Sequence, residues 1–153
     1  MSNDTNNGYA GKILEVDLSE QSIRTIPLAD NFKELFVGGR ALATALLFQQ
    51  LSGKQGPQGN PIKELDPVSK DNALVFCTSP AIGTNVPTAS RIHLAFKSPL
   101  TGGIGSSSSG GKWGGELKKT GFDALVVKGS SEKLTVLIID EDGPSLEPAP
   151  EAD

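Results

Sequence analysis

The sequence predicts an α+β fold, with a mixed or antiparallel sheet of about six strands, one long helix and one short helix. Short runs of continuous or alternating apolar residues recur between Gly-, Pro- and Asn-rich segments, and these runs indicate the strands. One segment, 40–51, instead repeats its apolar residues at helical spacing. A length of 153 residues and a hydrophobic content of 37% are sufficient for one domain with a single core.

The composition narrows the possible partners and compartment. The formal net charge is −4, whereas surfaces that bind nucleic acid or anionic membranes need clustered Lys and Arg. No apolar run approaches the roughly 20 residues that cross a bilayer, and the first residues lack the pattern of a secretory signal. One cysteine and one histidine cannot build a metal site from the usual soft and borderline ligands. We therefore expect a cytoplasmic protein with no nucleic-acid partner and no membrane insertion.

The first third of the chain predicts a hairpin followed by helices. Residues 1–7 are polar and are expected to form a flexible N-terminus. Apolar runs at 13–18 and 23–26 flank a turn, which is typical of a β-hairpin. Asp30 is placed to cap a short helix, and the long helix over 40–51 follows two glycines.

The middle of the chain predicts a loop and then a buried strand. Residues 52–72 are rich in Gly, Pro, Lys and Asp without periodicity, which indicates an exposed loop. The continuous apolar run 73–77 follows, as in a strand inside a sheet. Cys77 is either a small buried hydrophobic residue or a nucleophile, and the lack of a second cysteine or a positioned base favours the structural role.

Two arginines stand where predicted elements begin. Arg40 opens the long helix, where a cation opposes the helix dipole, so either an anion or carboxylate holds it or water solvates it. Arg91 opens the strand 91–97, whose alternate residues from Arg91 onward are expected to face away from the core. A guanidinium there suits phosphate or the polar edge of a cofactor, and a solvated face is the alternative. His93 is more typical of a surface or hydrogen-bonded residue than of a catalytic one.

The segment 101–121 contains eight of the 18 glycines and four consecutive serines, followed by a short helical pattern. Such a loop either cradles a phosphate with its backbone amides or serves as a flexible turn. Two further strands are predicted at 122–129 and 133–140. Residues 144–153 are acidic and rich in proline, which predicts a disordered tail. The expected domain therefore covers residues 8–143.

Several of these segments together resemble the N-terminal domain of the tungsten-containing aldehyde ferredoxin oxidoreductase family. In order, the matching motifs are GYAGKILEVDLS, GGRALA, LDPVSKDNALVF, SPAIGTNVPTASR, SPLTGG and GGKWGGELK. Ordered motifs at consistent spacing, from about Gly8 to Gly143, are more specific than a single glycine motif. The resemblance implies that this chain is half of the family's N-terminal domain. In the family, that domain forms the floor beneath a tungsten or molybdenum bis-pyranopterin cofactor, whose two phosphates are bridged by magnesium.

The resemblance also implies roles for four residues. Arg91 would contact a pterin and reach toward a 4Fe–4S cluster held by another chain. Ser108 would bind magnesium through its backbone carbonyl, and Gly110 and Gly111 would lie against the cofactor. The family often has asparagine where this chain has Ser108. This change keeps the backbone carbonyl as a ligand but removes any bond made by the asparagine side chain. No catalytic side chain is expected in this chain.

Members of the family have several hundred residues, and their second pterin loop, cluster cysteines and substrate pocket lie outside the matched region. The resemblance therefore implies a small subunit, not catalytic alone, of an oxidoreductase complex that interconverts aldehydes and carboxylic acids. Its expected partners are a larger catalytic subunit and ferredoxin or another electron-transfer subunit. Two other hypotheses are a non-catalytic carrier of the pterin cofactor and a simple anion-binding module.

Overall fold

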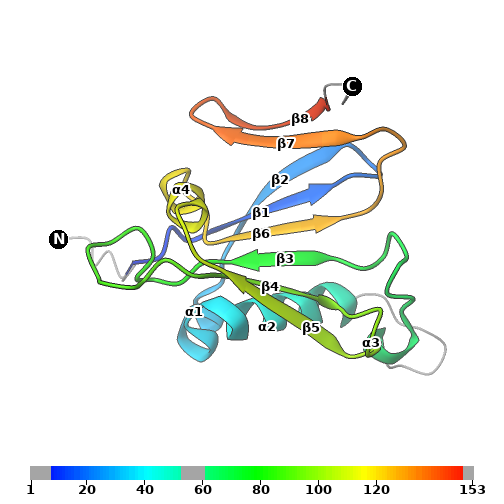
Figure 1. Ribbon diagram of the computed structural model, residues 1–153, viewed down its shortest axis with the longest axis horizontal. Coiled ribbons are helices and arrows are strands. Elements are labelled where there is room, and N and C mark those ends of the chain that lie inside the picture. Colours follow the sequence, from blue (N-terminus) through cyan, green and yellow to red (C-terminus); the bar gives the residue numbers. More distant parts are fainter. Residues whose placement is uncertain (1–7, 53–60, 150–153) are drawn as a thin grey trace.

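The computed structural model describes residues 8–52 and 61–149, and its main feature is a six-stranded mixed sheet (Figure 1). The strand order is β2-β1-β6-β3-β4-β5, in which β1 and β6 are parallel and all other neighbours are antiparallel. The strands of this sheet are β1 (Lys12–Asp17), β2 (Ser22–Pro27), β3 (Leu74–Cys77), β4 (Ile92–Lys97), β5 (Ile104–Ser109) and β6 (Ala124–Lys128). The remaining elements are the hairpin strands β7 (Thr135–Asp140) and β8 (Gly143–Pro148) and the helices α1 (Asp30–Phe36), α2 (Gly39–Ser52), α3 (Pro61–Glu64) and α4 (Trp113–Lys119). The predicted α+β class with about six strands is confirmed.

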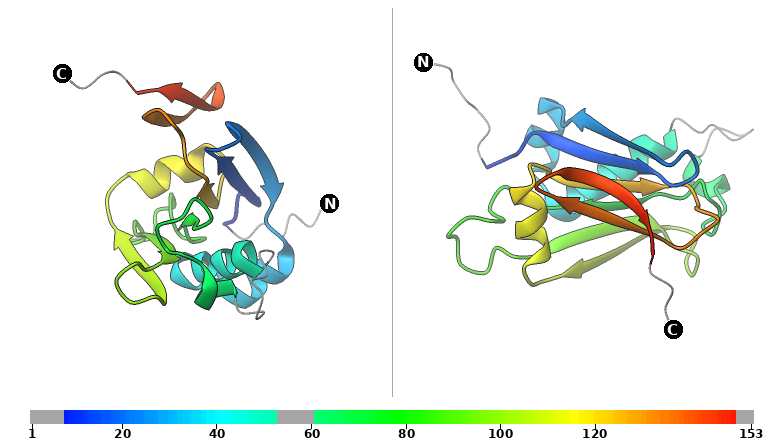
Figure 2. Two further views of the ribbon diagram at one scale, coloured as in Figure 1. Left: turned by 90° about the vertical axis from the view of Figure 1, so that its right-hand side faces the viewer. Right: turned by 90° about the horizontal axis from the view of Figure 1, so that it is seen from above.

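The larger core lies between α2 and one face of the sheet (Figure 2). The helix contacts β3 and β4. Its buried side chains recur at the spacing of one helical face, and they are Leu42, Ala43, Leu46, Leu47 and Leu51. They pack with Val75, Cys77 and Ala95 of the sheet. Because full burial of one leucine stabilises a fold by roughly 1.5–3 kcal/mol, this contact is a main source of stability.

The opposite face of the sheet carries a second, smaller core beneath α4 and the β7–β8 hairpin (Figure 2). Leu14 and Val16 of β1 are fully buried there, and Leu117 of α4 packs with them. Leu137 and Leu146, which lie opposite each other in the hairpin, add partly buried contacts. The hairpin therefore belongs to the same folded unit as the sheet.

Three sequence-based expectations about the strands are wrong. The stretch 104–109 is not part of a loop but forms β5, which pairs with β4 along its whole length. The strand expected at 133–140 is β7, which pairs with β8 and lies outside the six-stranded sheet. Residues 144–148, expected in a disordered tail, form β8, because Leu146 packs on the second core and the hairpin supplies backbone hydrogen bonds. The domain boundary expected at residue 143 is therefore wrong, and residues 1–7 and 150–153 lie outside the described residues.

The expected orientation of β4 is also corrected. Ala95 and Lys97 are buried on the α2 side of the sheet, although they were expected to face away from the core. The Lys97 ammonium group is accommodated because its Nζ donates hydrogen bonds to the backbone oxygens of Lys63, at 3.2 Å, and Leu65. Only the beginning of this face, at Arg91, is exposed.

Two helical details differ from expectation as well. Asp30 does not cap α1, whose N-cap is Ala29, and instead its carboxylate accepts a hydrogen bond from Lys33 Nζ at 3.0 Å. Part of the expected loop 52–72 forms α3, and residues 53–60 of it lie outside the described residues.

Candidate functional site

Arg91 and Ser108 lie side by side at one end of the β4–β5 pair. Arg91 directly precedes β4, and Ser108 pairs in register with His93, the second residue of that strand. Arg91 Nη1 donates a long hydrogen bond of 3.5 Å to Ser108 Oγ, and both side chains are exposed. The pairing thus joins two of the expected site residues, and no described residue occupies the other donors of the guanidinium, which are open to a ligand.

Gly110 and Gly111 follow β5 and leave the space beside Ser108 open. A Cβ added at either glycine would meet no atom within 4 Å. Gly111 has a φ of +97°, in the left-handed region that favours glycine, whereas Gly110 is not among the residues with positive φ. The expected close approach of a ligand to this backbone is therefore sterically possible, and only Gly111 is required by the backbone conformation.

The segments on either side of β4 and β5 meet near Arg91. A cavity of about 340 Å³ lies between the loop after β3 and the start of α4. Its lining includes Thr84, Ser90, Lys112, Glu116 and Lys119. Glu116 forms an ion pair with Lys119 at 2.9 Å, so the lining is polar and of mixed charge, and Lys112 is its cation outside that pair.

His93, the second residue of β4, is partly buried at this end of the sheet. A Cβ at Gly39, the first residue of α2, would lie 3.0 Å from His93 Cδ2, so the helix begins directly against the imidazole. His93 Nδ1 is buried and has no hydrogen-bond partner within residues 8–52 and 61–149. Burial lowers the pKa of His93, and the positive charges of Arg40 and Arg91 lower it further. The lowered pKa favours the neutral imidazole, which is neither fully exposed nor hydrogen-bonded at Nδ1 to any described residue.

An ion pair that sequence reasoning did not single out fixes the loops around the site. Asp123 is 1% exposed, and its carboxylate accepts hydrogen bonds from the backbone N–H groups of Ala10, at 3.1 Å, and Gly11, at 2.6 Å. The same carboxylate pairs with Lys118 of α4, whose Nζ also donates to the Ser79 carbonyl at 3.4 Å. One buried carboxylate thus joins the approach to β1, the loop after β3 and the end of α4. An acidic residue at the start of an apolar strand is the only sequence signal for it.

The remaining sequence candidate, Cys77, is structural, as expected. Its side chain is completely buried in the larger core, and burial raises the pKa of its thiol far above the usual range. A thiol that stays protonated near neutral pH is a poor nucleophile. Among the described residues, no group of three or more His, Cys, Asp or Glu side chains is placed to hold a metal ion. In the same part of the chain, no helix has the length and apolar character needed to cross a membrane.

An open apolar groove runs along the outer face of α2 and ends near the site. We call it the α2 groove, and its volume is about 910 Å³. It lies between α1 and the edge strand β5, and its lining includes Phe32, Phe36, Ala41, Ala45, Phe48 and Ile104. Phe48 is 54% exposed, and Arg40 is the only charged residue in the lining described here. An exposed apolar surface of this kind is typical of a protein interface.

Comparisons with known proteins agree on one family. Residues 13–153 match the model of the aldehyde ferredoxin oxidoreductase N-terminal domain. The chain is 36% identical over 135 residues to a tungsten-containing aldehyde ferredoxin oxidoreductase of Pyrococcus horikoshii, which covers 88% of this chain and 21% of that protein. It is 29% identical over 134 residues to the WOR-like subunit of an aliphatic sulfonate oxidoreductase of Pyrococcus furiosus, with 88% and 20% covered.

A solved structure is similar in fold. One chain of the active site complex BamBC of benzoyl coenzyme A reductase, in complex with 1,5-dienoyl-CoA, superposes with a TM-score of 0.82 at 28% identity. The match covers 92% of this chain and 20% of the other. The chain therefore spans about a fifth of the length of the proteins that it matches.

Proposed function

Because the chain belongs to the aldehyde ferredoxin oxidoreductase N-terminal domain family, we propose that it is the small, cofactor-binding subunit of a tungsten or molybdenum bis-pyranopterin oxidoreductase complex. The observation that carries this proposal is the pairing of Arg91 with Ser108 beside the open backbone of Gly110 and Gly111. These are the four residues to which the family resemblance assigns cofactor contacts. Tungsten in the names of several relatives makes a tungsten pterin the first choice.

The chemistry of the donor set fits such a group. A pyranopterin carries a phosphate and a polar ring edge, and both are recognised well by a guanidinium with free donors. The Arg91 side chain would bind and orient the pterin, while the glycines let the backbone approach it without a side chain between them. Ser108 would contribute its backbone carbonyl to a magnesium ion, a hard cation that prefers oxygen ligands.

Within the complex, the cofactor would supply the two-electron interconversion of an aldehyde and a carboxylic acid. This chain's residues would hold the pterin and shape its pocket, and no side chain here is proposed as a catalytic acid or base. Arg91 and the cationic residues near it would also stabilise the negative charge of the bound group. A cytoplasmic location fits this role.

The proposed partner is a larger catalytic subunit that carries the 4Fe–4S cluster, the second pterin loop and the substrate pocket. Ferredoxin or another electron-transfer subunit would accept the electrons. Two observations support a large partner: the chain spans only about a fifth of the relatives' length, and the α2 groove leaves apolar side chains uncovered by the described residues.

The test is to purify the chain with an affinity tag from its native host and analyse what is bound. We expect tungsten or molybdenum, oxidised pterin fluorescence, and a larger chain of the same family that lacks the matched N-terminal fifth. Pterin without a larger chain would instead identify a cofactor carrier. A pure chain that binds phosphate but neither pterin nor metal would leave only the anion-binding module.

A further inference from the structure

We propose that Arg40, at the start of α2, is a second guanidinium of this site and binds an anionic phosphate of the cofactor together with Arg91. The inference rests on the proposed function, because it assigns a further residue to the same site. For Arg40, the sequence left two alternatives: an anion or carboxylate holds the side chain, or water solvates it. The proposal selects the bound anion.

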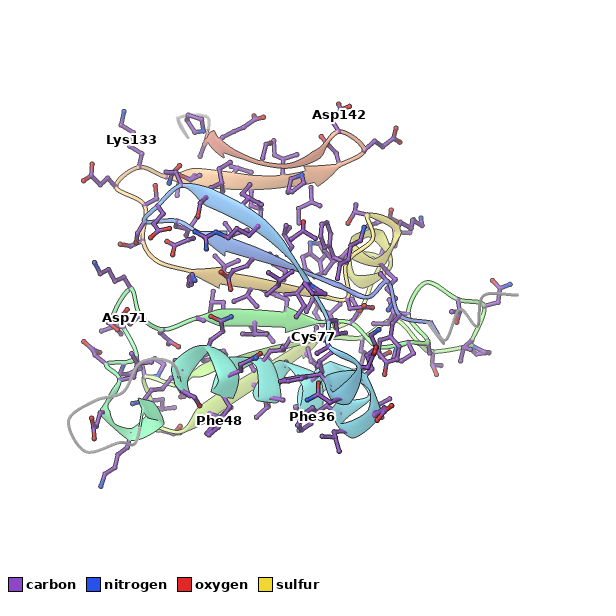
Figure 3. The ribbon with its side chains drawn as sticks, turned by 180° about the vertical axis from the view of Figure 1, so that it is seen from behind. Phe36, Phe48, Asp71, Cys77, Lys133 and Asp142 are labelled. Atoms are coloured by element: carbon purple, nitrogen blue, oxygen red, sulfur yellow. The ribbon has the colours of Figure 1, made fainter. Side chains whose placement is uncertain are left out.

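The first argument is the position at which α2 begins. The glycine pair Gly38–Gly39 brings the helix against the sheet, since Gly39 N donates to the Thr78 carbonyl at 2.7 Å. A Cβ at Gly38 would lie 2.9 Å from Ser79 Cα, and one at Gly39 would lie 3.0 Å from His93 Cδ2. Figure 3 shows Phe36, where α1 ends, on the same side of the molecule as Cys77, where β3 ends. A larger residue at Gly38 would force a local shift against the Ser79 backbone, and one at Gly39 would be strained by the φ of +58° and would press on the imidazole.

This turn places Arg40 beside the start of β4. Arg40 follows Gly39 directly, and the imidazole that Gly39 contacts lies two residues after Arg91 in the strand. In Figure 1 the α1–α2 junction and the start of β4 lie at the same end of the sheet. Two guanidinium groups therefore lie near one histidine, and their charges both lower the pKa of that imidazole.

The second argument is that the charges at this place are not neutralised. Within residues 8–52 and 61–149, Arg40 makes no hydrogen bond or ion pair, and its side chain is exposed. Among the residues that the structure describes, Arg91 has only the long contact with the Ser108 hydroxyl. Two neighbouring guanidiniums without a carboxylate repel each other, and an anion between them removes the repulsion and accepts their donors.

The third argument is the orphaned nitrogen of His93. Buried polar atoms in folded proteins nearly always have a hydrogen-bond partner, so a buried Nδ1 without one is an exception that needs a cause. The imidazole is near enough to Arg40 and Arg91 for both charges to lower its pKa, and it lies on the strand pair that carries Ser108. A ligand that completes this site would account for the unpaired nitrogen of His93.

The alternative is that Arg40 meets a carboxylate of a partner protein, because Arg40 also lines the α2 groove. A direct binding measurement separates the two. The chain contains a single histidine, so the ring nitrogen signals of His93 can be observed without ambiguity by 15N NMR. We would titrate the full chain with inorganic pyrophosphate in 0.15 M KCl, which screens distant charges.

Three variants are compared with the wild type: Arg40→Gln, Arg91→Gln and the control Arg24→Gln. Arg24 is an exposed arginine on β2, at the opposite edge of the sheet, and its loss changes the net charge equally. We expect a saturable shift of the His93 signals in the wild type, a dissociation constant raised about tenfold by each site variant, and less than a twofold change in the control. Arg40→Lys, which keeps the charge and loses the fork, should give an intermediate affinity.

The inference is overturned by an unchanged affinity in Arg40→Gln, by the absence of any shift in the wild type, or by equal losses in all three variants. A normal pyrophosphate affinity in Arg40→Gln together with lost co-purification of the larger chain would assign Arg40 to the α2 groove and also overturn it. Failure of the proposed function has a different signature. There, no pterin or metal accompanies the wild-type chain from its host, whatever the result of the pyrophosphate titration.

Discussion

Substitution of Gly110 can distinguish an effect on the proposed cofactor site from an effect on the stability of the fold. A Cβ at this position meets no atom within 4 Å, and its backbone is outside the left-handed region. Gly110→Val should therefore leave the free energy of unfolding within about 0.5 kcal/mol of the wild type. The branched side chain would occupy the space proposed for the pterin, so cofactor content should fall about tenfold or more, which corresponds to ~1.4 kcal/mol or more.

Two neighbouring variants give the matched comparison. Ser108→Ala removes only the 3.5 Å contact with Arg91 and keeps the backbone carbonyl, so cofactor content should stay within about twofold. Gly111→Ala places a Cβ on a backbone with a φ of +97°, so it should destabilise the fold itself by about 1–2 kcal/mol. The expected pattern is thus a stable but empty Gly110 variant, a nearly normal Ser108 variant and a destabilised Gly111 variant.

The assay measures two quantities for each variant. Urea denaturation of the chain alone gives the free energy of unfolding. Tungsten, molybdenum and oxidised pterin are then determined per mole of this chain in the purified complex, after assembly has been verified. If Ser108→Ala empties the site while Gly110→Val retains its cofactor, the serine hydroxyl rather than the backbone is the ligand, and the proposed geometry is refuted.

The remaining predictions test other parts of the structure. Arg91→Ala should weaken cofactor binding by about 1–3 kcal/mol and Arg91→Lys by less, and unchanged metal content in the alanine variant would return Arg91 to a solvated role. Asp123→Ala leaves the lysine and two N–H groups at this carboxylate unpaired and should lower the free energy of unfolding by about 3–5 kcal/mol; a loss under 1 kcal/mol would contradict the network. Burial raises the pKa of the Cys77 thiol, so its contribution to stability is complete below the unfolded pKa of about 8.5 and is lost progressively at higher pH. Between pH 7 and 10, the free energy of unfolding should therefore fall less steeply in Cys77→Ala than in the wild type. A parallel pH dependence in the two proteins would argue against this effect of Cys77. Phe48→Glu in the α2 groove should reduce co-purification of the larger chain, whereas Leu35→Glu, 72% exposed and outside the described groove lining, should not.

The fold was predictable where one periodic pattern decides the structure. The buried stripe of α2 and the short apolar runs of β1, β3 and β6 can be recognised without knowing their neighbours. The strand β5 could not be recognised, because its Gly and Ser residues have little strand preference and become extended only by pairing with β4. Likewise, Leu146 makes β8 a strand through its contact with the second core, a contact that an acidic, proline-rich sequence does not reveal.

The site was predictable in its parts but not in its arrangement. Arg91 and Ser108 were identified from motifs, yet their contact depends on the register of β4 with β5, which sequence patterns do not specify. Asp123 was missed because a buried carboxylate can be recognised only from the three segments that meet it. The place of Arg40 depends on the Gly38–Gly39 turn, whose close contacts with the sheet are long-range in sequence.

The edge strand β5 connects the proposed cofactor site to the surface proposed for the partner. Its serines 106–109 are all exposed, and the strand carries no charge or proline that would protect an open edge from pairing. Ile104 of the same strand lines the α2 groove, while Ser108 meets Arg91 at its other end. A partner that fills the groove would therefore also cover β5 and help to enclose the bound cofactor. Phe48→Glu should then lower cofactor content in proportion to the partner that it loses, whereas Arg91→Ala should lower cofactor content with the partner still bound.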